Sequence, residues 1–157
     1  MKFIERKNIN YIEPEIEQLL IGNWTSDFYL QVLYADPYAK DTNDASIVLK
    51  VGYKDVEFLL MADASTDLED LLVDSYDTLK VQILKAGHHG SNTSTSSKFL
   101  KAVKPEVTIL SYGKDNSYGH KHNEVLTNLK SAGSKVYSTA QDGTIVITTN
   151  GKTYCCC

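Results

Sequence analysis

The sequence predicts a layered α/β fold, because short apolar runs alternate with amphipathic helical stretches from Phe28 onward. With 157 residues, the chain has the size of one ordinary domain and leaves little room for a second core. We therefore expect one domain over residues 27–154. An N-terminal extension of unclear structure precedes it over residues 1–26, and a cysteine tail follows over residues 155–157.

The composition is that of a folded protein, with 42% apolar and 23% charged residues. The net charge of −4 gives no sign of the basic face that usually binds nucleic acid, although a bound metal ion can supply positive charge locally. No run approaches the roughly 18 apolar residues of a membrane helix, and Met1–Tyr11 lacks the apolar stretch of a signal peptide. We expect the chain, as given, to be soluble.

The first half of the chain predicts three strands. Glu15–Ile21 is compatible with a short helix, and residues 28–32 then alternate apolar and other side chains as a strand does. The apolar runs Ile47–Val51 and Val56–Met61 are joined by a short segment that begins at Gly52. Because glycine favours turns, we expect these two strands to form a hairpin.

Helices and strands then alternate. Thr66 and Glu69 have the spacing of a capping box, which predicts a helix over Thr66–Ser75, and Val81–Ala86 is the next strand. Further along, the Ser/Thr cluster at 93–97 offers caps for a second helix.

That second helix ends at Pro105, and the strand Val107–Leu110 follows. A third helix around residues 125–129 is closed by Gly133. Two final strands, Lys135–Ser138 and Thr144–Thr148, are predicted to pair through the Asp-Gly turn that separates them.

The cysteines offer no disulfide framework, because all three are consecutive at the end of the sequence: Cys155, Cys156 and Cys157. We assign them no role.

Chemically useful side chains follow the predicted strands. All the histidines lie in loops after strands, namely His88, His89, His120 and His122. Asp63 ends another strand in the same way. Since strand ends in layered α/β folds open onto one edge, these groups are expected to converge there.

Imidazoles and carboxylates at one edge are the ligands of zinc-like ions, which lower the pKa of water enough to form hydroxide. Asp63 and His120 are the candidate ligands. His88 or His89 can donate a proton or stabilise developing charge, and the backbone N–H groups around Gly90 and Ser91 can face an anion. These last four residues are contiguous in the sequence.

Structural alternatives remain open at this point. Asp63 can simply cap the helix that follows it, and His122 can cap or precede the third helix. The His88-His89 pair is harder to explain structurally, because two imidazoles flanked by glycines contribute nothing to a core.

Taken in order, these segments resemble the ComEC-type branch of the metallo-β-lactamase superfamily. The resemblance covers Asn43 to Gly151 and is carried by five segments: Asn43–Leu49, Phe58–Asp63, Leu84–Ser91, Ser111–Gly113 and Asn116–His120. It implies the C-terminal half of a four-layer αβ/βα sandwich, with a mixed sheet and helices on its outer face. It also implies phosphodiester hydrolysis at one or two zinc ions, with manganese as an alternative, in competence and DNA uptake.

By motif position, the resemblance makes Asp63 a bridging metal ligand and His120 a second ligand. His88 and His89 lie beside the metals as catalytic residues or ligands, without a choice between the two roles. Asn116 and His122 are expected to support the ligands.

The departures from the family pattern limit this expectation. The His-x-His-x-Asp-His cluster of the family is absent, Ala62 stands where glycine usually precedes the aspartate, and Lys121 replaces a common proline. We therefore expect a partial hydrolase domain, weak or inactive alone, that self-associates or is completed by a missing N-terminal half. Its parent would be a membrane-associated or exported bacterial protein. The alternative is a non-catalytic remnant of the fold or a protein-interaction module.

Overall fold

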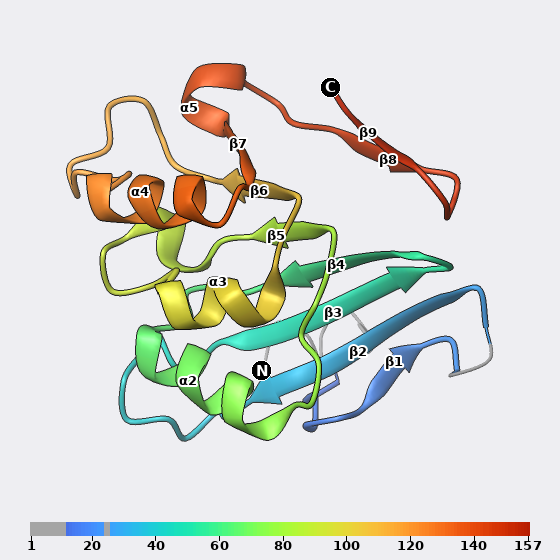
Figure 1. Ribbon diagram of the computed structural model, residues 1–157. Coiled ribbons are helices and arrows are strands. Elements are labelled where there is room, and N and C mark those ends of the chain that lie inside the picture. The colour runs from blue at the N-terminus through green and yellow to red at the C-terminus, as the bar shows by residue number, and fades with distance from the viewer. Residues whose placement is uncertain (1–11, 24–25) are drawn as a thin grey trace, which may run out of the picture.

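The computed structural model describes residues 12–23 and 26–157 and consists of one large sheet, one layer of helices and a small C-terminal hairpin (Figure 1). The large sheet has seven strands in sequence order. They are β1 (Leu19–Ile21), β2 (Phe28–Ala35), β3 (Ile47–Tyr53), β4 (Val56–Leu60), β5 (Ile83–Lys85), β6 (Val107–Leu110) and β7 (Lys135–Ser138). The α/β class predicted from the alternating pattern is confirmed.

The sheet is mixed, with its change of direction at β4. Strands β1 to β4 pair antiparallel, whereas β4 to β7 pair parallel. The predicted hairpin of β3 and β4 is confirmed, with Leu49 opposite Leu60 and Tyr53 opposite Val56. Parallel pairing requires crossover connections, which the helices between the later strands supply.

Three helices cover one face of this sheet: α2 (Thr66–Ser75), α3 (Ser97–Val103) and α4 (Asn123–Ser131) (Figure 1). Their buried stripes meet the sheet in a single core. Its members include Leu68 and Leu72 from α2, Phe99, Leu100 and Val103 from α3, Val125 and Leu129 from α4, and Val48, Leu59, Leu84 and Leu110 from the strands. Fully burying each such side chain contributes about 1.5–3 kcal/mol, so this layer holds the strand ends in place.

The N-terminal helix proposed over Glu15–Ile21 is wrong. This segment instead pairs with β2: the Glu17 N–H donates to the Val32 carbonyl, and the Val32 N–H donates to the Gln18 carbonyl. An available strand edge satisfies the backbone groups of this segment and outweighs its weak helical pattern. Residues 1–11 of the expected extension lie outside the described residues.

The capping box is also wrong, although helix α2 has the predicted bounds. Ser65 is the N-cap, and its side chain accepts the Leu68 N–H. Asp63 does not cap this helix, so the structural alternative for that residue fails. Glu69 turns into the protein instead of back to the cap.

The end of the chain differs from prediction as well. After β7, the chain forms the short helix α5 (Thr139–Asp142), and β8 (Ile147–Thr149) pairs with β9 (Tyr154–Cys156) instead of β7. The Ser138 N–H donates to the Asp142 carboxylate, which makes the Asp-Gly segment a helix end and not a hairpin turn. Two residues of the expected cysteine tail, Cys155 and Cys156, therefore belong to a strand.

Candidate functional site

The predicted residues gather where three parallel strands end. Asp63 follows β4, the turn Gly87–Gly90 follows β5, and the loop that holds His120 follows β6. Because β4, β5 and β6 are parallel neighbours, these three loops leave the sheet at the same edge. The convergence expected from the sequence is present in the structure.

Asp63 and His89 face each other at this edge. The Asp63 Oδ1 atom lies 3.5 Å from His89 Nε2, and each side chain is 48% exposed. On its other side, His89 Nδ1 lies 2.6 Å from the Ser111 carbonyl oxygen. A carbonyl can only accept, so Nδ1 carries the hydrogen, and a neutral His89 presents a bare Nε2 lone pair to the carboxylate.

The other imidazoles surround His120. Its ring centroid lies 5.8 Å from that of His88, 6.0 Å from that of His89 and 5.9 Å from that of His122. Tyr118 stacks on the same ring at 5.7 Å. All four histidines named from the sequence thus form one cluster.

His120 has an unpaired nitrogen within this cluster. Its Nδ1 atom is buried and has no hydrogen-bond partner. Burial, and then the neighbouring histidines, lower the pKa of His120, whereas Asp63 opposes the shift. This shift favours the neutral imidazole, which is the form that binds metals.

Asn116 holds the backbone of His120 from both sides. Its side-chain oxygen accepts the His120 N–H at 2.8 Å, and its side-chain nitrogen donates to the His120 carbonyl at 2.6 Å. His122 is the N-cap residue of α4 but makes no side-chain capping bond, and its N–H donates to the Gly90 carbonyl. Both residues thus adjoin His120.

The turn that carries His88 and His89 has an unusual backbone. Both histidines have left-handed conformations, with φ of 43° and 56°, and so does Ala62, with φ of 49°. The His88 N–H donates to the Ala62 carbonyl at 3.0 Å, so these positions are joined. Left-handed conformations of non-glycine residues cost on the order of 1–3 kcal/mol each and gather at functional sites.

The anion-facing role assigned to this turn does not suit Ser91. Its N–H donates to the His88 carbonyl at 2.9 Å, and the residue is buried. This amide is used inside the turn and is not free for an anion. At Gly90, with φ of +81°, an added Cβ would approach Leu110 Cδ2 to 3.2 Å, which explains a glycine there.

Two charged residues, Lys85 and Glu69, adjoin the segments of the site and were given no role in it from the sequence. Lys85, at the end of β5, donates to the Ala86 carbonyl, and burial lowers its pKa while Asp63 opposes the shift. Glu69 is fully buried and binds two backbone amides. A lysine in an otherwise apolar strand was a usable signal for Lys85. Glu69 was assigned to a capping box, and no sequence signal indicated that its side chain is buried.

The distance between Asp63 and His89 is compatible with two ligands of one metal ion. Tetrahedral zinc, with bonds of about 2.0–2.2 Å, holds two ligand atoms roughly 3.4 Å apart, and Asp63 Oδ1 and His89 Nε2 are 3.5 Å apart. Across residues 12–23 and 26–157, however, no group of three or more His, Cys, Asp or Glu side chains is arranged to hold an ion. One pair of atoms thus has the separation of two ligands of a single ion, and His120 lies beside that pair.

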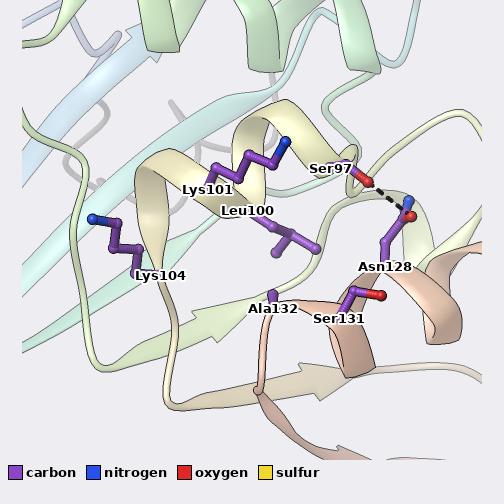
Figure 2. Close-up of a pocket in the computed structure, with 7 residues that line it drawn as sticks. All are labelled: Ser97, Leu100, Lys101, Lys104, Asn128, Ser131 and Ala132. Carbon is purple, nitrogen blue, oxygen red and sulfur yellow. Dashed lines mark hydrogen bonds between the residues drawn. The ribbon is translucent and has the colours of Figure 1, made fainter.

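A separate hollow of about 310 Å³ lies between α3 and α4 (Figure 2). Its lining contains none of the histidines and no Asp63; it consists of Ser97, Leu100, Lys101, Lys104, Asn128, Ser131 and Ala132. The candidate site is therefore an open edge of the sheet and not this pocket.

Among the helices that the structure describes, none combines the length and the apolar character of a membrane-spanning helix.

Comparison with known proteins supports a relationship over most of the chain, although no protein-family model matches it. It is 36% identical over 110 residues to ComE operon protein 3 of Bacillus subtilis, covering 70% of this chain and 14% of that protein. It is 39% identical over 106 residues to competence protein ComA of Neisseria gonorrhoeae, covering 67% and 15%.

A third similarity has the same extent. The chain is 35% identical over 103 residues to recombination protein 2 of Haemophilus influenzae, covering 66% of this chain and 13% of that protein. This chain thus spans about one seventh of the length of the relatives that it matches. Their names support its relationship to a family of competence proteins.

Proposed function

We propose that this chain is part of a metal-dependent hydrolase that cleaves phosphodiester bonds of nucleic acid during DNA uptake. The observation that carries the proposal is the facing pair of Asp63 Oδ1 and His89 Nε2, 3.5 Å apart, with the Ser111 carbonyl directing the lone pair of His89 toward the carboxylate. Two electron-rich atoms in this arrangement require a proton or a metal cation between them. Similarity to competence proteins supports nucleic acid as the substrate class.

In this proposal, Asp63 and His89 would hold one divalent ion, zinc or manganese, and His120 lies beside them. When bound, such an ion lowers the pKa of a water molecule to near neutrality. Hydrolysis adds the water oxygen to phosphorus, breaks one P–O ester bond and requires a proton for the leaving oxygen.

His88 is the candidate donor of that proton. Its Nδ1 atom lies 3.2 Å from the Thr93 hydroxyl, and its ring adjoins that of His120. The hydroxyl fixes the ring orientation and leaves Nε2 for the reacting group. Asn116 and His122 serve to orient His120.

The sheet face opposite the helices bears apolar side chains that are only half-buried, which supports the proposal that the chain is part of a larger unit. In β4, Leu59 is buried under the helices, so Phe58 and Leu60 point to the other face, where both are only half-buried. Leaving an apolar face in water costs about 25 cal/mol per Å². We propose that the other half of a four-layer sandwich covers this face in a longer protein, or that a second copy covers it in the isolated chain.

Metal content and activity test the proposed hydrolase. The purified chain is expected to bind zinc or manganese and to hydrolyse a bis-aryl phosphodiester slowly, and Asp63→Ala should abolish both. Asp44→Ala is a matched control, because the Asp44 carboxylate only accepts the Ser65 N–H. A folded chain that takes up no metal and has no activity would instead support a non-catalytic binding module.

Oligomeric state tests whether the sheet face that bears Phe58 and Leu60 mediates self-association. Light scattering should give an average mass that rises with protein concentration, and replacing Phe58 with a polar residue should suppress the rise. A strictly monomeric protein at all concentrations would contradict self-association.

A further inference from the structure

Glu69 is a charged residue placed where solvent cannot reach it. It lies in the middle of α2, and its exposed fraction is 0%. Carboxylates are almost never fully buried unless they are paired or hydrogen-bonded, because loss of hydration is costly. Its partners therefore indicate what the residue is for.

Both carboxylate oxygens of Glu69 accept backbone N–H groups from the segment before α3. One oxygen accepts the Thr95 N–H, and the other accepts the Ser96 N–H at 2.8 Å. Ser96 is the N-cap of α3, and its hydroxyl accepts the Phe99 N–H. Glu69 thus joins α2 to the start of α3.

The segment held by Glu69 is connected directly to the histidine turn. The Ser94 hydroxyl is 2.9 Å from the Gly87 carbonyl and 3.1 Å from the Ser91 carbonyl, so it spans the two ends of the turn. The neighbouring Thr93 hydroxyl lies 3.2 Å from His88 Nδ1. Residues next to the bound amides therefore fix both the turn and one imidazole.

The segment needs such a restraint because of its backbone. Thr95 is a β-branched residue with φ of 61°, a left-handed conformation that its side chain disfavours. From the other side, the Asn128 side-chain nitrogen donates to the Thr95 carbonyl, and Figure 2 shows Asn128 beside Ser97, to which it is also bonded. Contacts from α2 and α4 together hold Thr95 in place.

We propose that Glu69 is a positioning residue for the histidine site, acting through the amides of Thr95 and Ser96 on the turn that carries His88 and His89. The expected effect on metal affinity rests on the proposed metal site, whereas the expected effect on the turn rests only on the hydrogen bonds described above. Groups that orient ligands typically change metal affinity by about 10- to 100-fold when they are lost.

Glu69→Gln is the variant to test, because glutamine keeps the volume but offers an oxygen to only one of the two amides. Asp70→Asn is the matched control: it removes a carboxylate from the next position of α2, where Asp70 pairs with exposed Lys98. We expect amide hydrogen exchange at residues 87–96 to rise at least about tenfold in Glu69→Gln relative to the control, with β3 and β4 unchanged. Zinc affinity should fall by about 10-fold or more.

Ser94→Ala provides an independent test at the next contact. It should speed exchange at residues 87–91 and leave the Thr95 and Ser96 amides protected, because it removes only the later connection. If Glu69→Gln does not fold, this variant still tests the connection.

Three outcomes would overturn the proposal. They are unchanged exchange at residues 87–91 in Ser94→Ala, unchanged exchange there in a folded Glu69→Gln, and a uniform rise over the whole sheet, which would make Glu69 a general stabiliser. If the unmodified chain binds no zinc, the proposed metal site fails, whereas the exchange pattern still decides the role of Glu69.

Discussion

Two polar clusters lie at opposite ends of β4, and their bonding differs. At the start of β4, Glu57 binds Lys50 at 2.9 Å and accepts the Tyr29 hydroxyl, so each member of the cluster has a partner. Beyond the end of β4, Asp63 lies 3.5 Å from a half-exposed imidazole, and a nearby buried nitrogen has no partner.

The difference separates a structural cluster from a reactive one. In the Glu57 cluster, charge and hydrogen bonds are balanced within the protein, and burial raises the pKa of Tyr29 so that it stays a donor. In the histidine cluster, the backbone is strained at Ala62, His88 and His89, and the buried Nδ1 atom of His120 has no hydrogen-bond partner. Incomplete bonding in an ordered, strained segment is expected where a ligand binds.

The largest effect on stability should therefore come from the structural cluster. Glu57→Ala would leave the mostly buried Lys50 ammonium and the Tyr29 hydroxyl without the carboxylate. We expect the free energy of unfolding to fall by about 3 kcal/mol, measured by urea denaturation. Glu57→Gln, which keeps an acceptor, should lose less. Equal stability of Glu57→Ala and the unmodified chain would remove the contrast between the clusters.

A smaller effect is expected from the pH dependence of Glu69. Burial outweighs the amide bonds and raises the pKa of Glu69 to about 7 from 4.5, with a minor contribution from Asp70. Because the folded state binds this proton more tightly, the contribution of Glu69 to stability is full below pH 4.5 and is lost as pH rises to about 7.

We expect the stability of the unmodified chain relative to Glu69→Gln to decline by on the order of 2 kcal/mol between pH 5 and 7.5, measured by urea denaturation at each pH. Asp70→Asn controls for the neighbouring charge. A difference that does not vary with pH would mean that the two amides keep the carboxylate ionised throughout.

The smallest effect on stability should come from Asp63. Asp63→Asn removes a half-exposed charge beside His89, and such pairs contribute less than about 1 kcal/mol. Thermal unfolding should therefore be nearly unchanged, although the same substitution should abolish metal binding. A loss as large as that of Glu57→Ala would make Asp63 part of the structural framework.

Much of the fold was predictable because its central elements have strong local patterns. The β3–β4 hairpin and helix α2 follow from apolar periodicity and turn residues. The predictions failed at both ends of the chain. Strand β1 forms because β2 offers an edge to a segment whose own pattern is weakly helical. Strands β8 and β9 form a local hairpin across Asn150-Gly151, a turn signal that the predicted pairing with Lys135–Ser138 left out.

The candidate site was predictable in its members but not in its bonding. The order of strands and loops was enough to predict that Asp63, His89 and His120 lie at one edge of the sheet. Other features depend on tertiary contacts: the Ser111 carbonyl that sets the tautomer of His89, and the partners of Glu69. Glu69 looked like a capping residue because spacing in the sequence does not indicate which way a helical side chain turns.

The change from antiparallel to parallel pairing at β4 also has a consequence for folding. Strands β2, β3 and β4 pair with near neighbours in the sequence, whereas β5, β6 and β7 join only after helical crossovers. Since distant pairings close slowly, we expect the hairpin half to form first and the edge bearing the histidines to assemble last. Pulsed hydrogen exchange during refolding should protect β3 before β6, and the reverse order would refute this sequence of events.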